Sequence, residues 1–297
     1  GGVLRGAGDS RTPMLVTAFA NVVNVALAYG MIYGHFGLPA LGAVGSAWAT
    51  FIARALALAL LVGALWRGSN GVSIGGRGRW RPDRRVAGQV LRIGVPAALE
   101  QVLVSSAFLA LSIVVARLGT NVLAAHRIAI NALALAFLPG IGFGIAATAL
   151  VGQSVGARRL DEGGAAARVA TTWAVIWMSA IAALLFVFAP QVLHLFTSDP
   201  AVVAAGAGGL RVVALAQPFW AVLFVQSGAL RGAGNTSFPL MVTGGGVWLS
   251  VVLALALVLT VGGGLVAVWA GFLAVAPAMA ALMWWRFQRT VAEGMTR

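Results

Sequence analysis

A single acidic residue of the sequence lies inside an apolar segment. Glu100 follows Pro96 by one helical turn, whereas the other acids fall between the apolar segments. A carboxylate in such a stretch is costly and typical of an ion or substrate site, where it could alternate between protonated and charged forms. Alternatively, a helix start near Pro96 favours negative charge, and Arg92 could pair with it. Both interpretations stay open.

Uncharged polar side chains also lie within apolar segments. Asn21 and Asn24 are three residues apart, and His126 and Asn131 lie close together on another segment, so each pair shares a helix face. Such groups line a water-filled cavity or join helices by hydrogen bonds, and for the asparagines we favour the cavity.

Two glutamines near a proline have a structural alternative. Gln217 and Gln226 could bind substrate, but we prefer that they satisfy backbone groups freed by Pro218. The candidate substrate- or cation-binding residues are therefore Glu100, Gln101, Asn21, Asn24, His126, Asn131, Gln217 and Gln226.

The residue types that catalysis or cofactor binding needs are scarce. The sequence has no Cys and three widely separated His, and it lacks a metal-ligand cluster, a nucleophile–base pair and a phosphate-binding glycine loop. We therefore expect no enzyme, no ATP-driven pump and no cofactor.

The composition is typical of an all-α, polytopic membrane protein. Hydrophobic residues make up 60% and charged residues 9% of the chain. The net charge of +13 arises mostly from arginines between apolar segments. This pattern indicates cytoplasmic loops that meet anionic headgroups, and we expect a lipid bilayer and no nucleic acid as partner.

Eight apolar segments are long enough to cross a bilayer. They run over residues 13–33, 41–66, 93–116, 122–150, 165–188, 202–230, 239–261 and 265–285.

The longest connection is an Arg- and Gly-rich linker over residues 67–92. We expect residues 1–66 to hold the last two helices of an N-terminal lobe, and 93–297 a C-terminal six-helix lobe. Arg-rich and Arg-poor loops alternate, so the linker and both termini of the chain are predicted to be cytoplasmic.

One motif occurs twice with a constant offset. Leu4–Thr17 is echoed by Leu230–Thr243, 226 residues later (239 − 13). In each copy an Arg is predicted to anchor at the polar interface, two glycines form a turn, and a short polar residue caps a helix with Pro in its first turn. Equal repeats of the same orientation predict two pseudo-symmetric lobes, with roughly 140 further residues, or four helices, before Gly1.

Several motifs resemble those of multidrug and toxic compound extrusion (MATE) transporters. They are Leu4–Pro13, Asn21–Asn24, Gly45–Thr50, Gly94–Gln101, Ala124–Ala129 and Val151–Ala157.

The resemblance implies a secondary exporter of amphipathic, often cationic drugs and toxic compounds in exchange for H⁺ or Na⁺. It also implies a plasma-membrane protein, monomeric at full length, with a cavity between two lobes. Val104 and Trp220 stand where the sodium-coupled branch has carboxylates, and the family's coupling Asp belongs to a helix that this sequence does not include. The resemblance therefore leaves the coupling ion open.

Two other functions remain possible from the sequence. A flippase for lipid-linked sugars shares the two-lobe plan, but it would need a basic cavity, and only Arg54, Arg127 and Arg211 are intramembrane candidates. A truncated, transport-incompetent membrane protein is the other alternative.

Overall fold

A computed structural model describes residues 1–68, 72–74 and 83–295. The chain divides into two compact units, Gly1–Arg81 and Pro82–Arg297, and this boundary falls within the predicted linker. Residues 69–71 and 75–82 of that linker, together with 296–297, lie outside the described residues.

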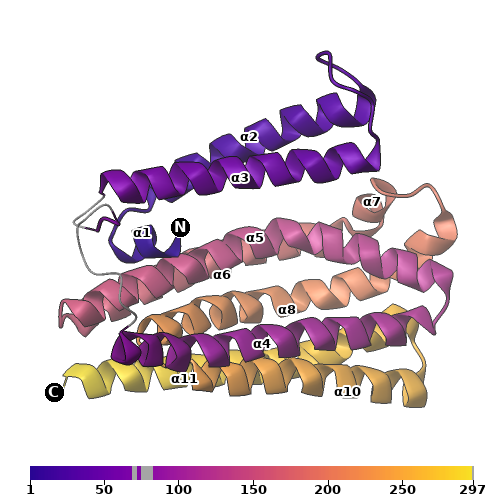
Figure 1. Ribbon diagram of the computed structural model, residues 1–297. Coiled ribbons are helices and arrows are strands. Elements are labelled where there is room, and N and C mark those ends of the chain that lie inside the picture. The colour runs from indigo at the N-terminus through magenta and orange to yellow at the C-terminus, as the bar shows by residue number, and fades with distance from the viewer. Residues whose placement is uncertain (69–71, 75–82, 296–297) are drawn as a thin grey trace. The chain divides into compact units, whose positions relative to one another are not determined.

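The first unit is a helical hairpin preceded by a short helix. A left-handed glycine, Gly34 (φ 77°), ends the first long helix. Gly45 lies so close to that helix that a Cβ there would be 2.3 Å from the carbonyl oxygen of Met31. The elements are α1 (Gly2–Gly6), α2 (Arg11–Tyr33) and α3 (Ala43–Arg67) (Figure 1).

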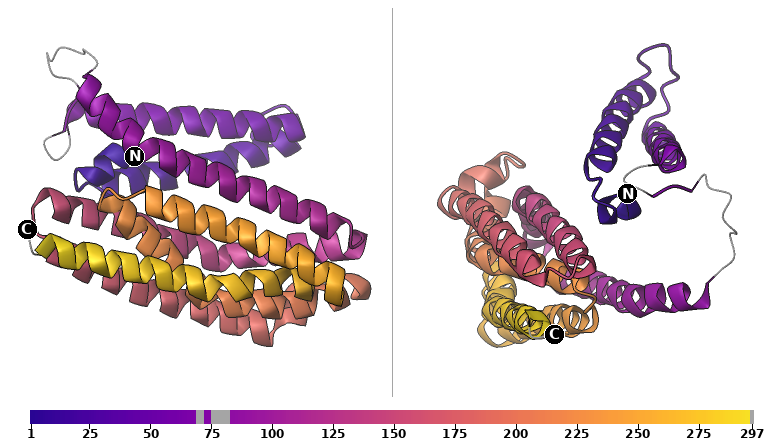
Figure 2. Two further views of the ribbon diagram at one scale, coloured as in Figure 1. Left: turned by 90° about the horizontal axis from the view of Figure 1, so that it is seen from below. Right: turned by 90° about the vertical axis from the view of Figure 1, so that its left-hand side faces the viewer.

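The second unit is a bundle of long helices that run side by side (Figures 1 and 2). Its elements are α4 (Arg84–Ala116), α5 (Thr120–Gly156), α6 (Leu160–Val187), α7 (Ala189–His194), α8 (Pro200–Gly232), α9 (Ser237–Pro239), the π-helical turn η1 (Leu240–Gly244), α10 (Gly245–Val261) and α11 (Gly264–Met295).

Helix α8 lies at the centre of this bundle and packs against α5, α6 and α11. Its contact with α5 is made through small residues. A Cβ on Gly228 would lie 2.1 Å from the carbonyl oxygen of Gly144, and the hydroxyl of Thr148 donates to the carbonyl of Gly228 at 2.9 Å. Because small residues let helix backbones approach closely, this seam fixes α8 relative to α5.

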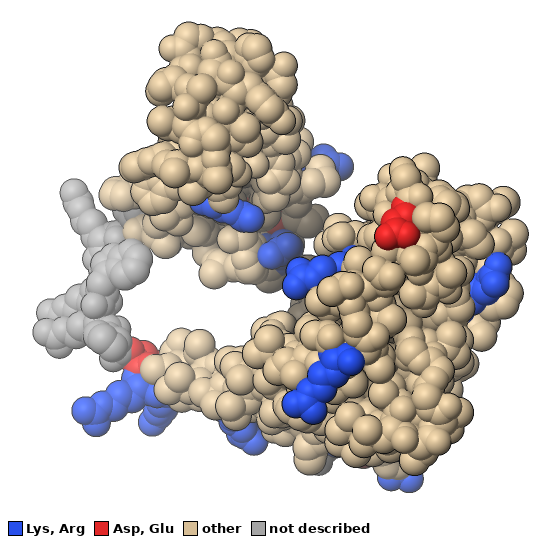
Figure 3. Space-filling view, turned by 90° about the vertical axis from the view of Figure 1, so that its right-hand side faces the viewer, with Lys and Arg blue, Asp and Glu red and all other residues tan. Residues whose placement is uncertain are grey.

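Eight helices in the described part of the chain are long and apolar enough to cross a membrane. Large apolar side chains such as Leu138, Trp173 and Leu259 are exposed. Residues other than Lys, Arg, Asp and Glu make up most of the face shown in Figure 3. The prediction of an all-α, polytopic membrane protein with eight spanning helices is confirmed.

Some helices extend past the predicted apolar segments. Helix α4 begins at Arg84 and not at Ile93, because Asp83 caps it by accepting a hydrogen bond from the Arg85 amide at 2.8 Å. Similarly, α11 continues beyond Trp285 to Met295. Hydropathy marks where the bilayer ends, whereas a helix continues as long as its residues favour helix.

The segment after Pro239 is less regular than predicted. A π-helical turn, η1, precedes α10, and a Cβ on Gly244 would meet Leu103 of α4 at 2.8 Å. Two residues further on, a Cβ on Gly246 would lie 2.5 Å from the sulfur of Met279 on α11. These glycines therefore allow α4 and α11 to approach the segment closely.

Candidate functional site

The buried carboxylate Glu100 forms an ion pair between two helices. Arg231, near the end of α8, donates from Nη2 to Oε1 of Glu100 on α4 at 2.6 Å. The Glu100 side chain is 5% exposed and that of Arg231 is 38% exposed. The carboxylate is thus buried, whereas part of the arginine side chain is exposed.

The suggested pairing of Glu100 with Arg92 is wrong, because its partner is Arg231. Glu100 and Arg92 lie on the same helix eight residues apart, which is about two turns and 12 Å. Arg231 reaches the carboxylate from a neighbouring helix instead. The prediction that Arg231 anchors the chain at the polar interface is therefore incomplete, because Arg231 also forms this ion pair.

The first copy of the repeated motif forms a compact turn. Gly8 adopts the left-handed conformation (φ 87°), and its amide donates to the carbonyl of Arg5 at 3.1 Å. The amide of Asp9 donates to the carbonyl of Leu4 at 2.9 Å. The Asp9 carboxylate then accepts from the amide of Thr12 at 2.9 Å and so caps α2.

The second copy forms the same turn. Gly234 has φ 83°, and its amide donates to the carbonyl of Arg231 at 3.0 Å. The amide of Asn235 donates to the carbonyl of Leu230 at 2.9 Å, and its side-chain oxygen accepts from the amide of Phe238 at 3.2 Å. The predicted glycine turn and polar cap therefore occur in both copies.

The first glycine of each motif does not form the turn, because it is still helical. In the second copy this residue, Gly232, packs against α5, where a Cβ would lie 2.4 Å from the carbonyl oxygen of Thr148. In the first copy, no atom of the first unit outside the helix's own backbone lies within 4 Å of a Cβ on Gly6, among the described residues. Gly232 thus places the adjacent Arg231 at a fixed position on the bundle.

The predicted asparagine pair lies on α2 of the first unit. The amide of Asn24 donates to the hydroxyl of Thr50 on α3 at 3.4 Å, a long hydrogen bond between the two helices. Asn21 is exposed on the same helix.

His126 is buried against an aromatic cluster of the second unit. Its ring stacks on that of Trp269 with 5.4 Å between centroids, and Trp220 and Phe272 also contact Trp269. Neither ring nitrogen of His126 has a hydrogen-bond partner within the described residues. Buried polar atoms normally have a partner, so this site could take a water or a polar group of a bound molecule.

The two predicted glutamines are fully buried in α8 and differ in their contacts. Gln226 donates from its amide to the hydroxyl of Thr171 on α6 at 3.0 Å. Neither side-chain polar atom of Gln217 has a partner in the part of the chain that is described. We predicted that both side-chain amides hydrogen-bond to backbone groups near Pro218. No such hydrogen bond occurs among the described residues.

The last two candidates, Gln101 and Asn131, have exposed side chains. The amide of Gln101 donates to the hydroxyl of Ser105, one turn further along α4, at 3.3 Å. No hydrogen bond or ion pair within the described residues joins any two of the eight predicted site residues.

Sequence reasoning missed Arg231 as part of the site. The available signal was the burial of Glu100, since an ionised carboxylate in an apolar interior needs a cationic or hydrogen-bonding partner. The sequence offers many arginines, however, and the pairing depends on how α4 and α8 pack.

Comparison with known proteins identifies the family. Residues 96–256 match the MatE family model. A probable multidrug resistance protein NorM of Thermotoga maritima is 32% identical over 83% of this chain and 53% of its own length. The multidrug resistance protein NorM of Burkholderia vietnamiensis is 34% identical over 94% of this chain and 62% of its own length.

The same fold occurs in a solved structure. It is the outward-facing conformation of a multidrug resistance MATE family transporter, with a TM-score of 0.89 and 24% identity over 99% of this chain and 65% of the other. The chain spans about half the length of the curated relatives first matched, at 53% and 50%. With more than half of its residues inside the matched family model, the chain belongs to the MATE family of transporters.

Proposed function

We propose that this chain is part of a secondary active exporter of amphipathic, often cationic drugs and toxic compounds. Membership of the MATE family carries this proposal, together with the names of relatives that are called multidrug resistance proteins. The coupling ion in this proposal is H⁺ or Na⁺, and the full-length protein acts as a monomer in the plasma membrane.

The topology follows from the positions of the arginines. In the second unit, one end of the bundle holds the start of α4 and the ends of α8 and α11, with Arg84, Arg231 and Arg289 (Figure 1). We infer that this Arg-rich end faces the cytoplasm, as the positive-inside rule requires. Both termini of the chain are then cytoplasmic. Because the chain has no native Cys, single-cysteine labelling in intact cells tests this assignment.

The ion pair of Glu100 and Arg231 provides a way to couple ion movement to a change in helix packing. One carboxylate oxygen, Oε1, binds Arg231, whereas Oε2 has no hydrogen-bond partner in the described part of the chain. A proton or Na⁺ that binds the carboxylate competes with Arg231 for its charge. In the proposed mechanism, loading the ion loosens the contact between α4 and α8, and releasing it restores the contact.

Glu100 lies close enough to the Arg-rich end for ions to reach it from that side. It is 16 residues (116 − 100) from the far end of α4 at Ala116, which corresponds to about 24 Å of helix, whereas the hydrocarbon core is about 30 Å thick. Its carboxylate is thus within a few ångströms of the inner interface by this estimate. We assign it to the cytoplasmic side of the ion pathway.

The remaining candidates are proposed as polar groups along the substrate route. Those with unpartnered buried atoms, His126 and Gln217, offer hydrogen bonds to a substrate or its water. The others in this role are Asn21, Asn24, Gln101, Asn131 and Gln226.

Transport by the full-length protein in proteoliposomes tests the function. Ethidium movement is measured under an imposed H⁺ gradient, under an imposed Na⁺ gradient and with neither. The proposal predicts uphill ethidium transport that needs one of the two gradients. Transport that needs ATP, or no transport under either gradient by protein shown to be folded, contradicts it.

A further inference from the structure

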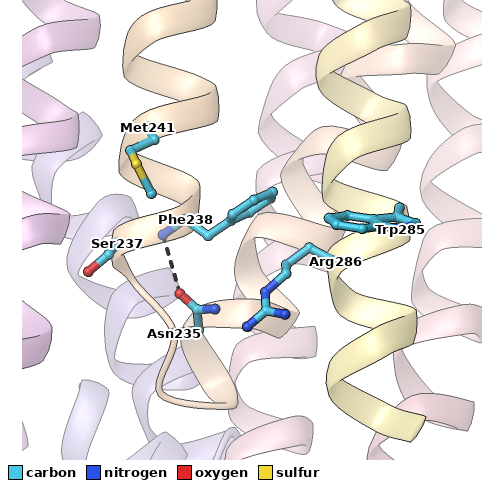
Figure 4. A pocket seen from close by; sticks show the side chains of 6 residues that line it. All are labelled: Asn235, Ser237, Phe238, Met241, Trp285 and Arg286. Atoms are coloured by element: carbon cyan, nitrogen blue, oxygen red, sulfur yellow. Dashed lines mark hydrogen bonds between the residues drawn. The ribbon is translucent and has the colours of Figure 1, made fainter. Parts of the chain in front are cut away.

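A pocket at the Arg-rich end of the second unit has no role in the proposed export cycle. It has a volume of about 380 Å³ and lies between the start of the α9–α10 segment and α11 (Figure 4). Its lining residues are Asn235, Ser237, Phe238, Met241, Trp285 and Arg286.

The depth of this pocket in a bilayer can be worked out from both helices that form it. Trp285 is 21 residues (285 − 264) from the far end of α11, and Met241 is 20 residues (261 − 241) from the far end of α10. Both distances correspond to about 30 Å of helix, the thickness of the hydrocarbon core. With the far ends of both helices set at the outer interface and no tilt, these lengths place Met241 and Trp285 at the acyl–headgroup boundary and Ser237 among the headgroups.

The polar half of the pocket offers hydrogen-bond donors and positive charge. The guanidinium of Arg286 points towards the side of the pocket where Asn235 lies (Figure 4). The side-chain oxygen of Asn235 accepts from the Phe238 amide, which leaves its NH₂ group as a donor. Ser237 adds a hydroxyl, and no acidic residue lines the pocket within the described residues. Outside the lining, Arg286 also forms an ion pair of 3.8 Å with Glu293, whose side chain is 64% exposed, so a bound phosphate would compete with this carboxylate.

The other half of the pocket is apolar. The Phe238 and Trp285 rings face it, and Met241 is 64% exposed on the side that would meet acyl chains. A second cation, Arg289, lies 4.2 Å from the centre of the Trp285 ring. An anionic group with an attached apolar chain matches both halves at this depth.

We propose that this pocket binds the phosphodiester headgroup of an anionic phospholipid, with Arg286 on the phosphate and Met241 against the acyl chain. The polar donors and the cation bind the phosphate oxygens, and the apolar rim adds affinity only for an anion that carries an acyl chain. The first copy of the motif lacks this chemistry, because Asp9 stands where Asn235 does and brings a negative charge.

Native mass spectrometry of the full-length protein in detergent tests this proposal. Delipidated protein is titrated with phosphatidylglycerol and with phosphatidylcholine of the same acyl chains. Loss of one interfacial arginine corresponds to about fivefold in affinity, so Arg286→Gln should weaken phosphatidylglycerol binding by that factor. Phosphatidylcholine has the same phosphodiester but also a cationic choline, which the arginines repel, so it should bind more weakly to the unmodified protein and lose less affinity in Arg286→Gln. Arg168→Gln, an exposed arginine at the same end of the bundle, serves as the matched control and should have little effect.

A second variant separates charge from folding. Asn235→Asp introduces the residue of the first copy, where Asp9 makes the same cap at 2.9 Å, so the turn is retained while a negative charge enters the pocket. Phosphatidylglycerol binding should fall here too, even if Arg286→Gln fails to fold. Equal binding of both lipids, unchanged binding in Asn235→Asp, or an equal loss in Arg168→Gln would overturn the proposal. Displacement of the lipid by glycerol phosphate would also overturn it in favour of a free-anion site.

Discussion

The two copies of the repeated motif have the same local structure and, among the described residues of their own units, different neighbours. Each has a left-handed glycine, Gly8 or Gly234, and each caps the next helix with the following side chain, Asp9 or Asn235. Beyond the turn they differ. In the second copy, Gly232 packs against the backbone of α5 and its neighbour Arg231 pairs with Glu100, whereas a Cβ on Gly6 of the first copy would meet nothing within 4 Å among the described residues.

The motif therefore determines its own turn but not its contacts with other helices. The turn depends only on residues within the motif, and it forms alike in both places. The tertiary contacts of the second copy depend on α4 and α5, which are not part of the motif. A shared motif thus identifies a shared turn, but the function of its arginine depends on the neighbouring helices.

The largest expected difference between the copies is at their helical glycines. A Cβ in Gly232→Ala would lie 2.4 Å from the Thr148 carbonyl oxygen, and such overpacking should cost about 3 kcal/mol of unfolding free energy. Within the described residues of the first unit, Gly6→Ala should cost nothing, because alanine favours helix and no atom of that unit outside the helix's own backbone lies within 4 Å of a Cβ at this position. Thermal unfolding of the two purified variants, followed by circular dichroism, measures the contrast. Equal shifts in Tm would show that the two surroundings do not differ as described.

A smaller effect is expected from the ion pair of the second copy. A double-mutant cycle of Glu100→Gln and Arg231→Gln should give a coupling energy of about 2 kcal/mol, reduced from that of a fully buried pair by the partial exposure of Arg231. The exposed pair Arg159 and Glu162 is the control and should give less than about 0.5 kcal/mol. Denaturant unfolding of each variant supplies the energies. A coupling no larger than that of the control would mean that the pair does not hold α4 to α8.

The smallest expected contrast lies in the turns themselves. Gly8→Ala and Gly234→Ala each place a Cβ on a left-handed residue, and each should cost about 1 kcal/mol. Because the turns are alike, the two losses should agree, in contrast to the pair Gly232 and Gly6. The same thermal unfolding experiment measures them. A loss in only one of the two variants would show that the turn depends on its surroundings.

Much of the architecture could be predicted because it follows from local properties of the sequence. Hydrophobic length predicts eight spanning helices, and the motif predicts two glycine turns with polar caps. Helix ends such as Arg84 could not be predicted from hydropathy, since capping by Asp83 extends α4 past its apolar part. The π-helical turn η1 was also missed, because hydrophobic length does not distinguish a π-helical turn from α-helix.

The candidate site was predictable only in part. The burial cost of Glu100 pointed to an important residue, but its partner Arg231 is 131 residues away and is brought close by the seam between α5 and α8. The remaining polar candidates were chosen by their position in apolar segments. That criterion does not distinguish a buried group such as Gln217 from an exposed one such as Asn131.

The most direct test of the proposed coupling is ethidium export measured across a range of pH in membrane vesicles that contain the full-length protein. Glu100→Gln keeps the size and most of the hydrogen bonding of the side chain but fixes it as neutral. We expect this variant to lose at least about tenfold in rate together with its dependence on pH. Glu162→Gln, which removes an exposed acid, should retain both. Export by Glu100→Gln at the normal rate and with the normal pH profile, at equal protein levels, would contradict a coupling role for Glu100.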